Sequence, residues 1–471
     1  MAAAEFPRHP LDVDLSLMVG ISRSVRSWLS GVATGESFVG RVLLVAGGTA
    51  SGQAVLLCSA PVLTRLYTPD DFGILAVYTA VLATLSIVAA LRFELGIPVA
   101  GDDETAANVL VLGALALLGT VMCTAAGVMV WKAFSRGSAW EGLLSQALWL
   151  PLGIGAAGVY QILSHWAIRA QEFAVLGRTK LFQAVGAVVV QVGLGFTGAG
   201  AVGLVAGDVV GRFSGSGRLG LRLWRRDSRH LRRISLSSLK AGMRRFGRFA
   251  LYSTGSALTN SIGLQVPPIL FGLLYGSQVA GWYGLAYRIV GIPVFLVGGA
   301  VAQVYLGHAA RYHHEDSVRL RILFKSCIRR LFLLGLLPAA ITAAVGPAAF
   351  AMVFGEDWLE AGLYARALAV FFLAQLVVSP VSQTLTILGR QDLQFWWDVG
   401  RLLLVVGSIG IPAWIGMVPV GAVTVFSGAT ALAYLALLIM VAHQLTRVNA
   451  AGDGVERSWA FSGVTGGQEA G

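Results

Sequence analysis

The chain has 471 residues, of which 56% are hydrophobic and only 13% are charged. Soluble domains carry about 25% charged residues, so this composition excludes an ordinary soluble enzyme. A membrane-spanning helix needs about 20 apolar residues, and about twelve such helices would take up around half of this length. The excess of 35 Lys and Arg over 24 Asp and Glu is compatible with either nucleic acid or an anionic membrane surface as a partner.

The first 40 residues predict a cytoplasmic N-terminal extension. No signal peptide is visible, because the first strongly apolar run begins only after Arg41 and lacks the small-residue cleavage motif. Between Leu15 and Leu29, apolar residues recur at helical spacing beside two arginines. This pattern suits a short helix on the membrane surface, and a loose extension is the alternative.

Twelve apolar stretches follow the extension. Stretches this long and this numerous predict an all-helical, multi-spanning membrane protein and not a soluble core. After Arg447 the chain becomes polar and rich in glycine, which predicts a disordered cytoplasmic tail over residues 447–471. The predicted spans cover roughly residues 42–63, 72–99, 107–131, 143–164, 181–198, 200–216, 248–274, 279–306, 331–354, 361–388, 393–414 and 417–446.

Basic residues gather on one side of the predicted membrane. With the N-terminus in the cytoplasm, the loops on that side hold 30 of the 35 Lys and Arg residues. The opposite side holds only Arg65, Lys132, Arg136 and Arg366, and Arg288 falls inside a span. The positive-inside rule therefore predicts that both termini are cytoplasmic, and it explains the net charge without a nucleic-acid partner.

The two halves of the chain share a weak repeat, which lies at the first span of each half and its exit turn. It predicts two six-helix lobes in the same orientation, the N-lobe at 41–216 and the C-lobe at 248–446, joined by a basic, solvated cytoplasmic connector at 217–247. Parallel repeats of this kind are a transporter architecture with the substrate between the halves. Gly40-Arg41, Gly48 and Pro61 match Gly247-Arg248, Gly255 and Pro268 at a shift of 207, and Leu66-Tyr67 and Gly73 match Leu274-Tyr275 and Gly281 at a shift of 208.

Charged side chains inside hydrocarbon are candidates for a functional site, because each costs at least a few kcal/mol there. Arg288 falls near the middle of its predicted span, where it either faces a cavity or pairs with Asp208. Asp208 is either a proton or cation site or the partner of Arg212, one helical turn away, and pairing is the favoured interpretation. Arg92 and Glu94 lie near the cytoplasmic end of the second span, where a snorkelling arginine is the alternative to a cavity position.

Small and amide side chains also occur at regular places in the spans. Glycines recur at every fourth residue from Gly203 to Gly215, which predicts that another helix packs closely against this face. The amides either line a central path or cross-link helices. They are Gln53, Gln191, Gln265, Gln303 and Gln375.

Enzymatic and metal-binding patterns are weak. The glycines from Gly193 to Gly198 have the form of a dinucleotide fingerprint, but they fall at a helix exit with no preceding soluble strand. The string from His313 to Asp316 could bind a metal, although adjacent loop residues are more often only solvated. The three cysteines have neither pairing nor metal-ligand spacing. The sequence therefore predicts no catalytic residue, no cofactor and no metal centre.

Three strings of the chain stand out. They are Leu63 to Gly73 continuing at Leu91 to Leu95, Ala286 to Arg288 with Gly291 to Pro293, and Ser379-Pro380 with Leu388 to Gln391. These strings resemble the bacterial oligosaccharide flippases that serve O-antigen and exopolysaccharide synthesis, members of the multidrug/oligosaccharidyl-lipid/polysaccharide exporter superfamily. The resemblance covers most of the chain from about Arg41 to Arg447. One departure argues against lipid II as substrate: the related peptidoglycan-precursor flippases carry a basic residue in the first span, and residues 42–63 contain none.

The resemblance implies a MATE-like fold of two lobes related by pseudo-twofold symmetry. It also implies a function, the export of undecaprenyl-pyrophosphate-linked glycans from the cytoplasmic to the periplasmic leaflet of the bacterial inner membrane by alternating access. The expected partners are a lipid-linked oligosaccharide, the membrane, and a polysaccharide polymerase with a chain-length regulator. The predicted substrate-binding residues are Arg92, Arg288, Arg65, Tyr287, Gln265 and Gln303, and the candidates for ion coupling are Glu94 and Asp208.

Two other functions remain open at this point. A cation-coupled multidrug exporter of the same superfamily would depend on Asp208 or Glu94 and would show no glycan phenotype. A membrane glycan polymerase or ligase would need a large outward-facing loop with catalytic groups. The longest outer connection predicted here has about ten residues, so this third function ranks below the others.

Overall fold

The computed structural model describes residues 38–134, 146–231, 236–315 and 317–462, and these residues form helices and turns without a β-strand. Nine helices of the described chain are long and apolar enough to cross a membrane, so the prediction of an all-helical multi-spanning protein is confirmed. The helices are α2 (Phe38–Leu66), α3 (Pro69–Ile87), α4 (Asp103–Phe134), α6 (Leu150–Arg169), α7 (Phe173–Gly195), α8 (Ala201–Phe213), α9 (Ser216–Leu231), α10 (Leu236–Tyr275), α11 (Ser277–Glu315), α12 (Ser317–Phe354), α13 (Leu359–Ile387), α14 (Gln391–Trp414) and α15 (Pro419–Ser462), with short 3-10 turns η1 (Phe93–Gly96), η2 (Ala147–Trp149) and η3 (Glu356–Trp358).

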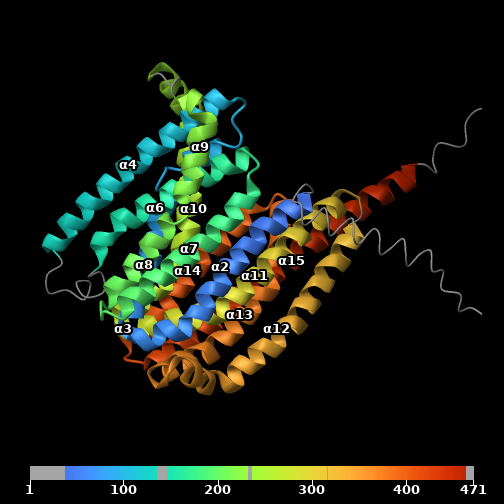
Figure 1. Ribbon diagram of the computed structural model, residues 1–471. Helices are drawn as coiled ribbons and strands as arrows, with labels where there is room; N and C mark the ends of the chain where they lie inside the picture. Colours follow the sequence, from blue (N-terminus) through green and yellow to red (C-terminus); the bar gives the residue numbers. More distant parts are fainter. Residues whose placement is uncertain (1–37, 135–145, 232–235, 316, 463–471) are drawn as a thin grey trace, which may run out of the picture.

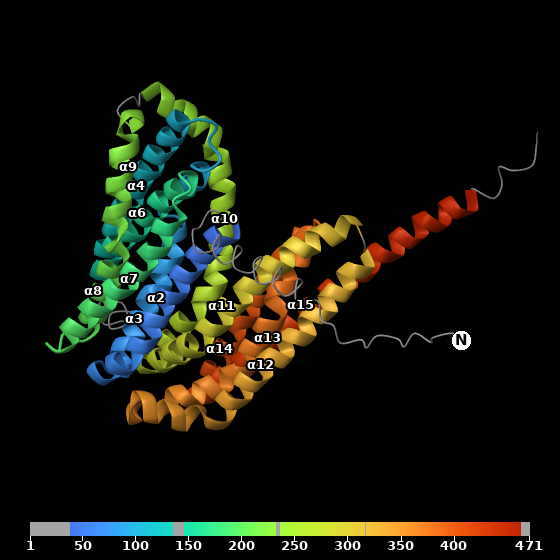
Figure 2. The same cartoon turned by 45° about the vertical axis from the view of Figure 1, so that its right-hand side comes forward.

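The helices pack as two groups. In the first group, α2 contacts α7, α7 contacts α8, and α6 contacts α4 and α8 (Figure 1). In the second group, α13 contacts α11, α12 and α15, and α14 contacts α15. Helix α10 belongs to both, since it packs against α3 and α4 as well as α11 and α14. Figure 2 shows the groups meeting at the lower end of the view, where α3 and α11 begin. We call this the closed end, and the opposite end the open end.

Local sequence fixes where α3 begins. Thr68 and Asp71 form a capping box, in which the Asp71 backbone N–H donates to Thr68 Oγ1 (3.3 Å) and the Thr68 N–H donates to Asp71 Oδ2 (3.0 Å). Pro69 occupies the first helical position, where its missing N–H costs nothing. The Leu66–Tyr67 exit of α2 is therefore followed at once by a new helix running back through the bundle.

Backbones from the two groups touch at the closed end. A Cβ atom on Gly73 would collide with the Ser277 carbonyl, and one on Gly281 would collide with the Pro69 carbonyl, so α3 and α11 meet through glycine faces. The Ser277 hydroxyl donates to Asp70 Oδ1 at 2.6 Å across the same contact. Gly73 and Gly281 are equivalent in the sequence repeat, and the structure brings these two repeat positions together.

An indole seals the closed end further. Trp358, in η3, is almost completely buried, and its Nε1–H donates to the Thr64 carbonyl of α2 at 3.1 Å. Its ring packs edge-on against Phe72 with a centroid distance of 4.9 Å. A residue of the second group is thereby fixed between α2 and α3 of the first.

Two helices end at places that differ from the sequence prediction. Helix α3 ends at Ile87 and not near residue 99, because Leu91 and Arg92 adopt left-handed backbone conformations (φ 48° and 60°) that a helix cannot contain. Helix α15 continues to Ser462, where a disordered tail was predicted. The predicted surface helix at residues 15–29 and the last residues of the tail lie outside the described residues.

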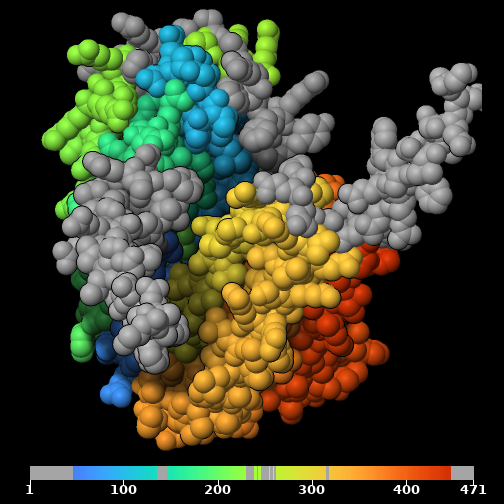
Figure 3. Space-filling view, turned by 90° about the vertical axis from the view of Figure 1, so that its right-hand side faces the viewer, coloured from blue at the N-terminus to red at the C-terminus, as the bar shows by residue number. Residues whose placement is uncertain are grey.

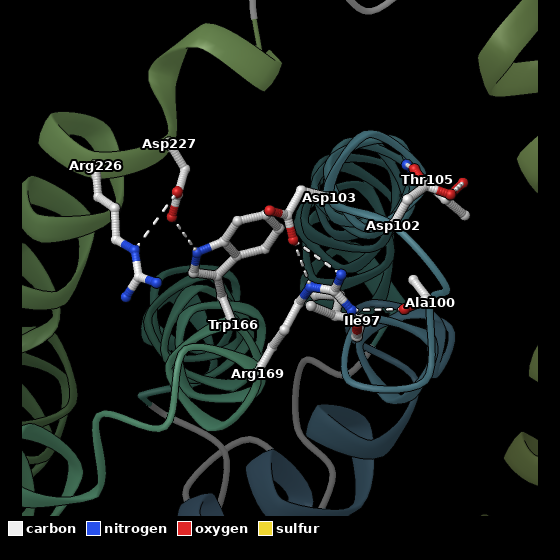
Figure 4. Close-up of polar contacts among 9 residues, drawn as sticks. All are labelled: Ile97, Ala100, Asp102, Asp103, Thr105, Trp166, Arg169, Arg226 and Asp227. Carbon is white, nitrogen blue, oxygen red and sulfur yellow. Dashed lines mark hydrogen bonds and ion pairs between the residues drawn. The ribbon is translucent and has the colours of Figure 1, made fainter.

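The described residues of the basic connector are also helical, and α9 packs on the first group where a solvated link was predicted. Helix α9 buries Leu219 and Leu223 and contacts α4 and α6. At the open end the Trp166 indole donates to Asp227 Oδ2 at 2.9 Å, which ties α9 to α6. Close by, Arg169 donates to Asp103 Oδ1 (2.9 Å) and to the Ala100 carbonyl (2.6 Å), as Figure 4 shows. These contacts connect the open ends of α4, α6 and α9.

The outer surface of the second group is strongly apolar. Figure 3 shows one face on which α12, coloured yellow to orange, runs across the molecule. A hydrocarbon environment accounts for this exposure, since helices satisfy their own backbone hydrogen bonds and need no polar side chains towards lipid. The exposed apolar residues of α12 include Phe332, Leu333, Leu334, Leu336, Leu337 and Ile341.

Candidate functional site

A cavity of about 660 Å³ lies between the two helix groups. Its walls are α2, α3, α7 and α8 on one side and α10 and α11 on the other, and Phe72 lines it beside the sealed end. Binding sites for small molecules typically have volumes of about 300 to 1,000 Å³, and the volume of this cavity lies in that range. The cavity is the place where a ligand can contact both groups at once.

Among the described residues, four charged side chains line this cavity. Lys180, Arg212 and Arg288 are cationic and Asp208 is anionic, so the formal charge of the lining is 3 − 1 = +2. Lys180 and Asp208–Arg212 come from the first group and Arg288 comes from the second. The charge favours an anionic ligand that bridges the two groups.

Asp208 and Arg212 form the strongest polar contact in the cavity. Arg212 Nε donates to Asp208 Oδ2 at 2.7 Å and Nη2 donates to Oδ1 at 3.2 Å, a two-pronged pair one helical turn apart on α8. This agrees with the favoured interpretation from the sequence. Both side chains keep part of their surface exposed, 21% for Asp208 and 33% for Arg212, so a ligand can reach the pair.

The other two cations are engaged differently. Arg288 lies eleven residues after Ser277, which is about 16 Å along α11 from the closed end. Over the described ranges its guanidinium has no hydrogen bond or ion pair. The Lys180 ammonium lies 4.3 Å from the centroid of the Tyr160 ring, a contact that stabilises a cation without neutralising it. Both cations are free to accept an anionic partner.

Amides and aromatic rings complete the lining. Gln53, Gln183, Gln191 and Gln265 are on the wall, and two of them also cross-link helices. Gln191 Nε2 donates to the Leu204 carbonyl (3.0 Å), and Gln183 Nε2 donates to the Arg212 carbonyl (3.3 Å). On the α11 side, the aromatic lining consists of Tyr283, Tyr287 and Phe295.

Glycines set the spacing of α7 and α8. A Cβ on Gly207 would collide with Gln191, and one on Gly211 would come within 2.6 Å of Ala187 Cβ. The predicted glycine face therefore does pack closely against another helix, and that helix is α7. The close packing brings Lys180 and Gln183 of α7 beside Arg212 of α8.

The structure brings together four of the eight residues predicted to bind substrate or couple an ion. Arg288, Tyr287, Gln265 and Asp208 all lie on the cavity wall. Arg65 is exposed near the closed end, and Gln303 is exposed on α11 beyond the cavity, so neither belongs to the lining.

Arg92 and Glu94 lie at the η1 break between α3 and α4, outside the cavity lining. Glu94 is 3% exposed, and burial raises the pKa of its carboxyl above the ordinary value of 4.5. Arg92 and His165 partly oppose this shift. Glu94 Oε2 and Arg92 Nε have no hydrogen-bond partner in the described part of the chain.

Sequence reasoning missed Lys180, Gln183 and Arg212 as cavity residues. The predicted span began at residue 181, but α7 begins at Phe173, so Lys180 was counted in a loop. A signal was present: Lys180, Gln183 and Gln191, with small Ala187 between, recur at helical spacing and predict one polar face. Within the described residues, no group of three or more His, Cys, Asp or Glu could hold a metal ion.

The apolar helices of the described chain define a multi-pass membrane protein. The chain superposes with a TM-score of 0.66 on a multidrug resistance MATE family transporter in its inward-facing conformation, covering 86% of this chain and 96% of that one at 15% identity. It superposes equally well, at 0.66, on the lipid II flippase MurJ in an inward closed conformation, covering 86% and 90% at 13% identity. The prediction of a MATE-like fold is confirmed.

Residues 62–363 match the family described as Polysaccharide biosynthesis protein, and since this is more than half of the chain, the chain belongs to that family. Over 211 residues it is 32% identical to the teichuronic acid biosynthesis protein TuaB of Bacillus subtilis (strain 168), a stretch that spans 43% of each protein. Over 368 residues it is 25% identical to the succinoglycan biosynthesis transport protein ExoT of Rhizobium meliloti (strain 1021), which covers 75% of this chain and 70% of ExoT.

Proposed function

We propose that the chain is a flippase that moves undecaprenyl-pyrophosphate-linked oligosaccharides from the cytoplasmic to the periplasmic leaflet by alternating access, for O-antigen or exopolysaccharide synthesis. The observation that carries the proposal is the cavity of charge +2 between two helix groups that are sealed together at one end. Family membership and the names of TuaB and ExoT support a role in glycan assembly. The fold shared with MurJ supports lipid-linked cargo.

The cations of the cavity suit a pyrophosphate. A guanidinium holds two phosphate oxygens through parallel hydrogen bonds, and charge-assisted bonds of this kind are roughly twice as strong as neutral ones. Arg288 from one group and Lys180 from the other would bind the same headgroup, while the lipid tail stays in the bilayer. A ligand held in this way would draw the two groups together.

The orientation proposed is that of the bacterial inner membrane with both termini in the cytoplasm. Moving Lys180 and Arg212 from the loops to the cavity wall leaves 30 − 2 = 28 of the 35 basic residues on the side of the termini, so the asymmetry persists. On this basis the open end faces the cytoplasm, where lipid-linked units are made. A polysaccharide polymerase and a chain-length regulator on the opposite side would then receive the product.

Translocation in proteoliposomes tests the proposal. We expect purified protein to move a fluorescent undecaprenyl-pyrophosphate oligosaccharide between leaflets, measured by its accessibility to a membrane-impermeant quencher. Arg288→Ala should reduce the rate at least tenfold, and Arg65→Ala, which removes an exposed arginine outside the cavity, should not. An unchanged rate in Arg288→Ala removes this residue from the mechanism, and no translocation by the unaltered protein contradicts the proposal.

A cation-coupled multidrug exporter is the competing function, since the fold is shared with MATE transporters. The lining charge opposes the export of cationic drugs, because a cavity of net positive charge repels a cation. For either function, we propose Asp208 and Glu94 as the candidates for coupling an ion to transport. Drug efflux with no glycan phenotype would favour the exporter.

A further inference from the structure

In the described part of the chain, one carboxylate and three cations line the cavity, and this carboxylate is placed to do more than balance charge. Asp208 lies on α8 one helical turn before Arg212, and its two oxygens accept both hydrogen bonds from Arg212. It is also near enough to Arg288, on the opposite helix group, to act electrostatically on that guanidinium. Lys180 and Arg288 line the same space and form no ion pair within the described residues.

A phosphate and a carboxylate compete for the same arginine. Both present two oxygens to the guanidinium fork, so one can replace the other without rearranging the donor. A cavity with three unneutralised cations would be costly in a low-dielectric environment, and Asp208 lowers that cost while the site is empty. A carboxylate at this position would repel an anion that enters, and it would pair with Arg212 again as the anion leaves.

We propose that Asp208 is a built-in competitor for the anionic headgroup, which binds Arg212 in the empty cavity, loses it to a substrate phosphate, and displaces that phosphate from Arg212 at release. Asp208 therefore sets the affinity of the cavity below the value that its cations alone would give. The lower affinity keeps a highly charged headgroup from remaining bound in the cavity. The inference rests on the proposed function only for the identity of the headgroup.

Binding of inorganic pyrophosphate to the purified full-length protein in detergent tests the competition. Asp208→Asn keeps the shape of the side chain and removes its charge, so we expect the Kd measured by calorimetry to fall roughly tenfold or more, with slower dissociation. Asp208→Glu should have a Kd near that of the unaltered protein, because it retains the carboxylate. This variant also shows whether the site tolerates a substitution. In the Arg212→Gln background the effect of Asp208→Asn should largely disappear, since the contested arginine is gone.

Asp398 offers a matched control. It pairs with Arg401 at 3.2 Å on α14, one helical turn apart, and neither residue lines the cavity. Asp398→Asn should leave the Kd for pyrophosphate unchanged, which separates competition at Arg212 from the general loss of a negative charge.

The outcomes separate this inference from the proposed function. Unchanged or weaker binding in Asp208→Asn, in a protein that binds pyrophosphate, overturns the competition and makes Asp208 a positioning residue for Arg212. If neither protein binds pyrophosphate, both the competition and the proposed headgroup are wrong. Tighter binding in Asp208→Asn together with no translocation by the unaltered protein supports the competition and contradicts only the flippase function.

Discussion

Among individual residues, Lys180 is a cavity cation because α7 begins before it, at Phe173. It lies on the cavity wall in α7 and contacts the Tyr160 ring, whereas Arg178, two residues earlier on the same helix, is exposed and outside the lining. Side chains that are two residues apart on a helix point in well-separated directions. The pair therefore separates the effect of a cavity cation from that of basic charge in general.

Lys180→Gln should weaken pyrophosphate binding. A hydrogen bond to a charged group contributes about 1.5 to 3 kcal/mol, so we expect the Kd to rise roughly tenfold or more. Arg178→Gln should leave the Kd within about twofold, and titration calorimetry in detergent measures both. Equal losses in the two variants would mean that only overall charge matters.

Glu94 gives a prediction about pH. Burial raises the pKa of its carboxyl in the folded protein, so the folded state favours the neutral carboxyl. The neutral carboxyl therefore contributes to the stability of the folded protein fully below the ordinary pKa of 4.5. This contribution is lost as the pH rises through the higher pKa of the folded protein. Glu94→Gln, which cannot ionise, should flatten this dependence.

Thermal unfolding in detergent from acidic to neutral pH checks the prediction. The melting temperature of the unaltered protein should fall more over this range than that of Glu94→Gln. Asp102→Asn serves as the control, because Asp102 is exposed and hydrogen bonds from Thr105 lower the pKa of its carboxyl. Parallel curves for the unaltered protein and Glu94→Gln would contradict the prediction.

At this scale, two of the charged residues predicted from the sequence lie on the cavity wall and others lie elsewhere. Arg288 and Asp208 stand out because charged groups are rare in apolar stretches, and both line the cavity. Arg92 does not, because left-handed backbone at Leu91 and Arg92 ends the helix before it reaches the position that continuous helical geometry gives. No local pattern in an apolar string signals such a break.

Among the helices, the packing of α7 on α8 controls the geometry of the cavity. The Gly211 face allows the α7 backbone to approach so closely that a Cβ there would lie 2.8 Å from the Gln183 carbonyl oxygen. Gly193, on the same pair of helices, has open space beside it. These two glycines test whether close packing, and not glycine content alone, positions the polar face.

Gly211→Ala should destabilise the protein, and Gly193→Ala should not. Overpacking costs about 1 to 3 kcal/mol, because α8 must move away from α7 to accept the methyl group. Thermal unfolding in detergent should therefore show a lower melting temperature for Gly211→Ala only. Similar melting temperatures for both variants would show that the helices can separate freely.

Helix positions followed from hydropathy, whereas helix ends and the connector did not. All twelve predicted apolar stretches contain a helix, because long apolar runs have few other solutions in a bilayer. The connector reads as solvated because it is rich in arginine, yet Leu219 and Leu223 recur four residues apart and pack against α4 and α6. Its apolar stripe is narrow, so charge obscures it.

For the whole molecule, the contact between α3 and α11 closes one end of the cavity. It consists of backbone approaches at Gly73 and Gly281, the Ser277–Asp70 hydrogen bond, and the Trp358 indole on Thr64. The sequence repeat indicated that Gly73 and Gly281 correspond, but it could not show that they touch, because symmetry relates two segments without fixing the distance between them.

Cross-linking the closed end should stop transport. In a background lacking the three native cysteines, Asp70→Cys with Ser277→Cys should form a disulfide under oxidation, because the native side chains are 2.6 Å apart. Translocation in proteoliposomes should then fall to the background rate and recover on reduction, whereas each single cysteine variant should stay active. Full activity of the cross-linked protein would show that this end need not separate.

The glycine contact at the closed end also bears on how selectivity can change. It is made largely of main-chain atoms, which are the same whatever side chains surround them. If the cargo is the proposed lipid-linked glycan, this contact would exclude large and small saccharides alike. Discrimination between one repeating unit and another must then reside in the Gln, Tyr and Phe groups of the chamber. Variants selected in a host to carry a foreign glycan should accumulate changes along those walls and leave Gly73 and Gly281 untouched.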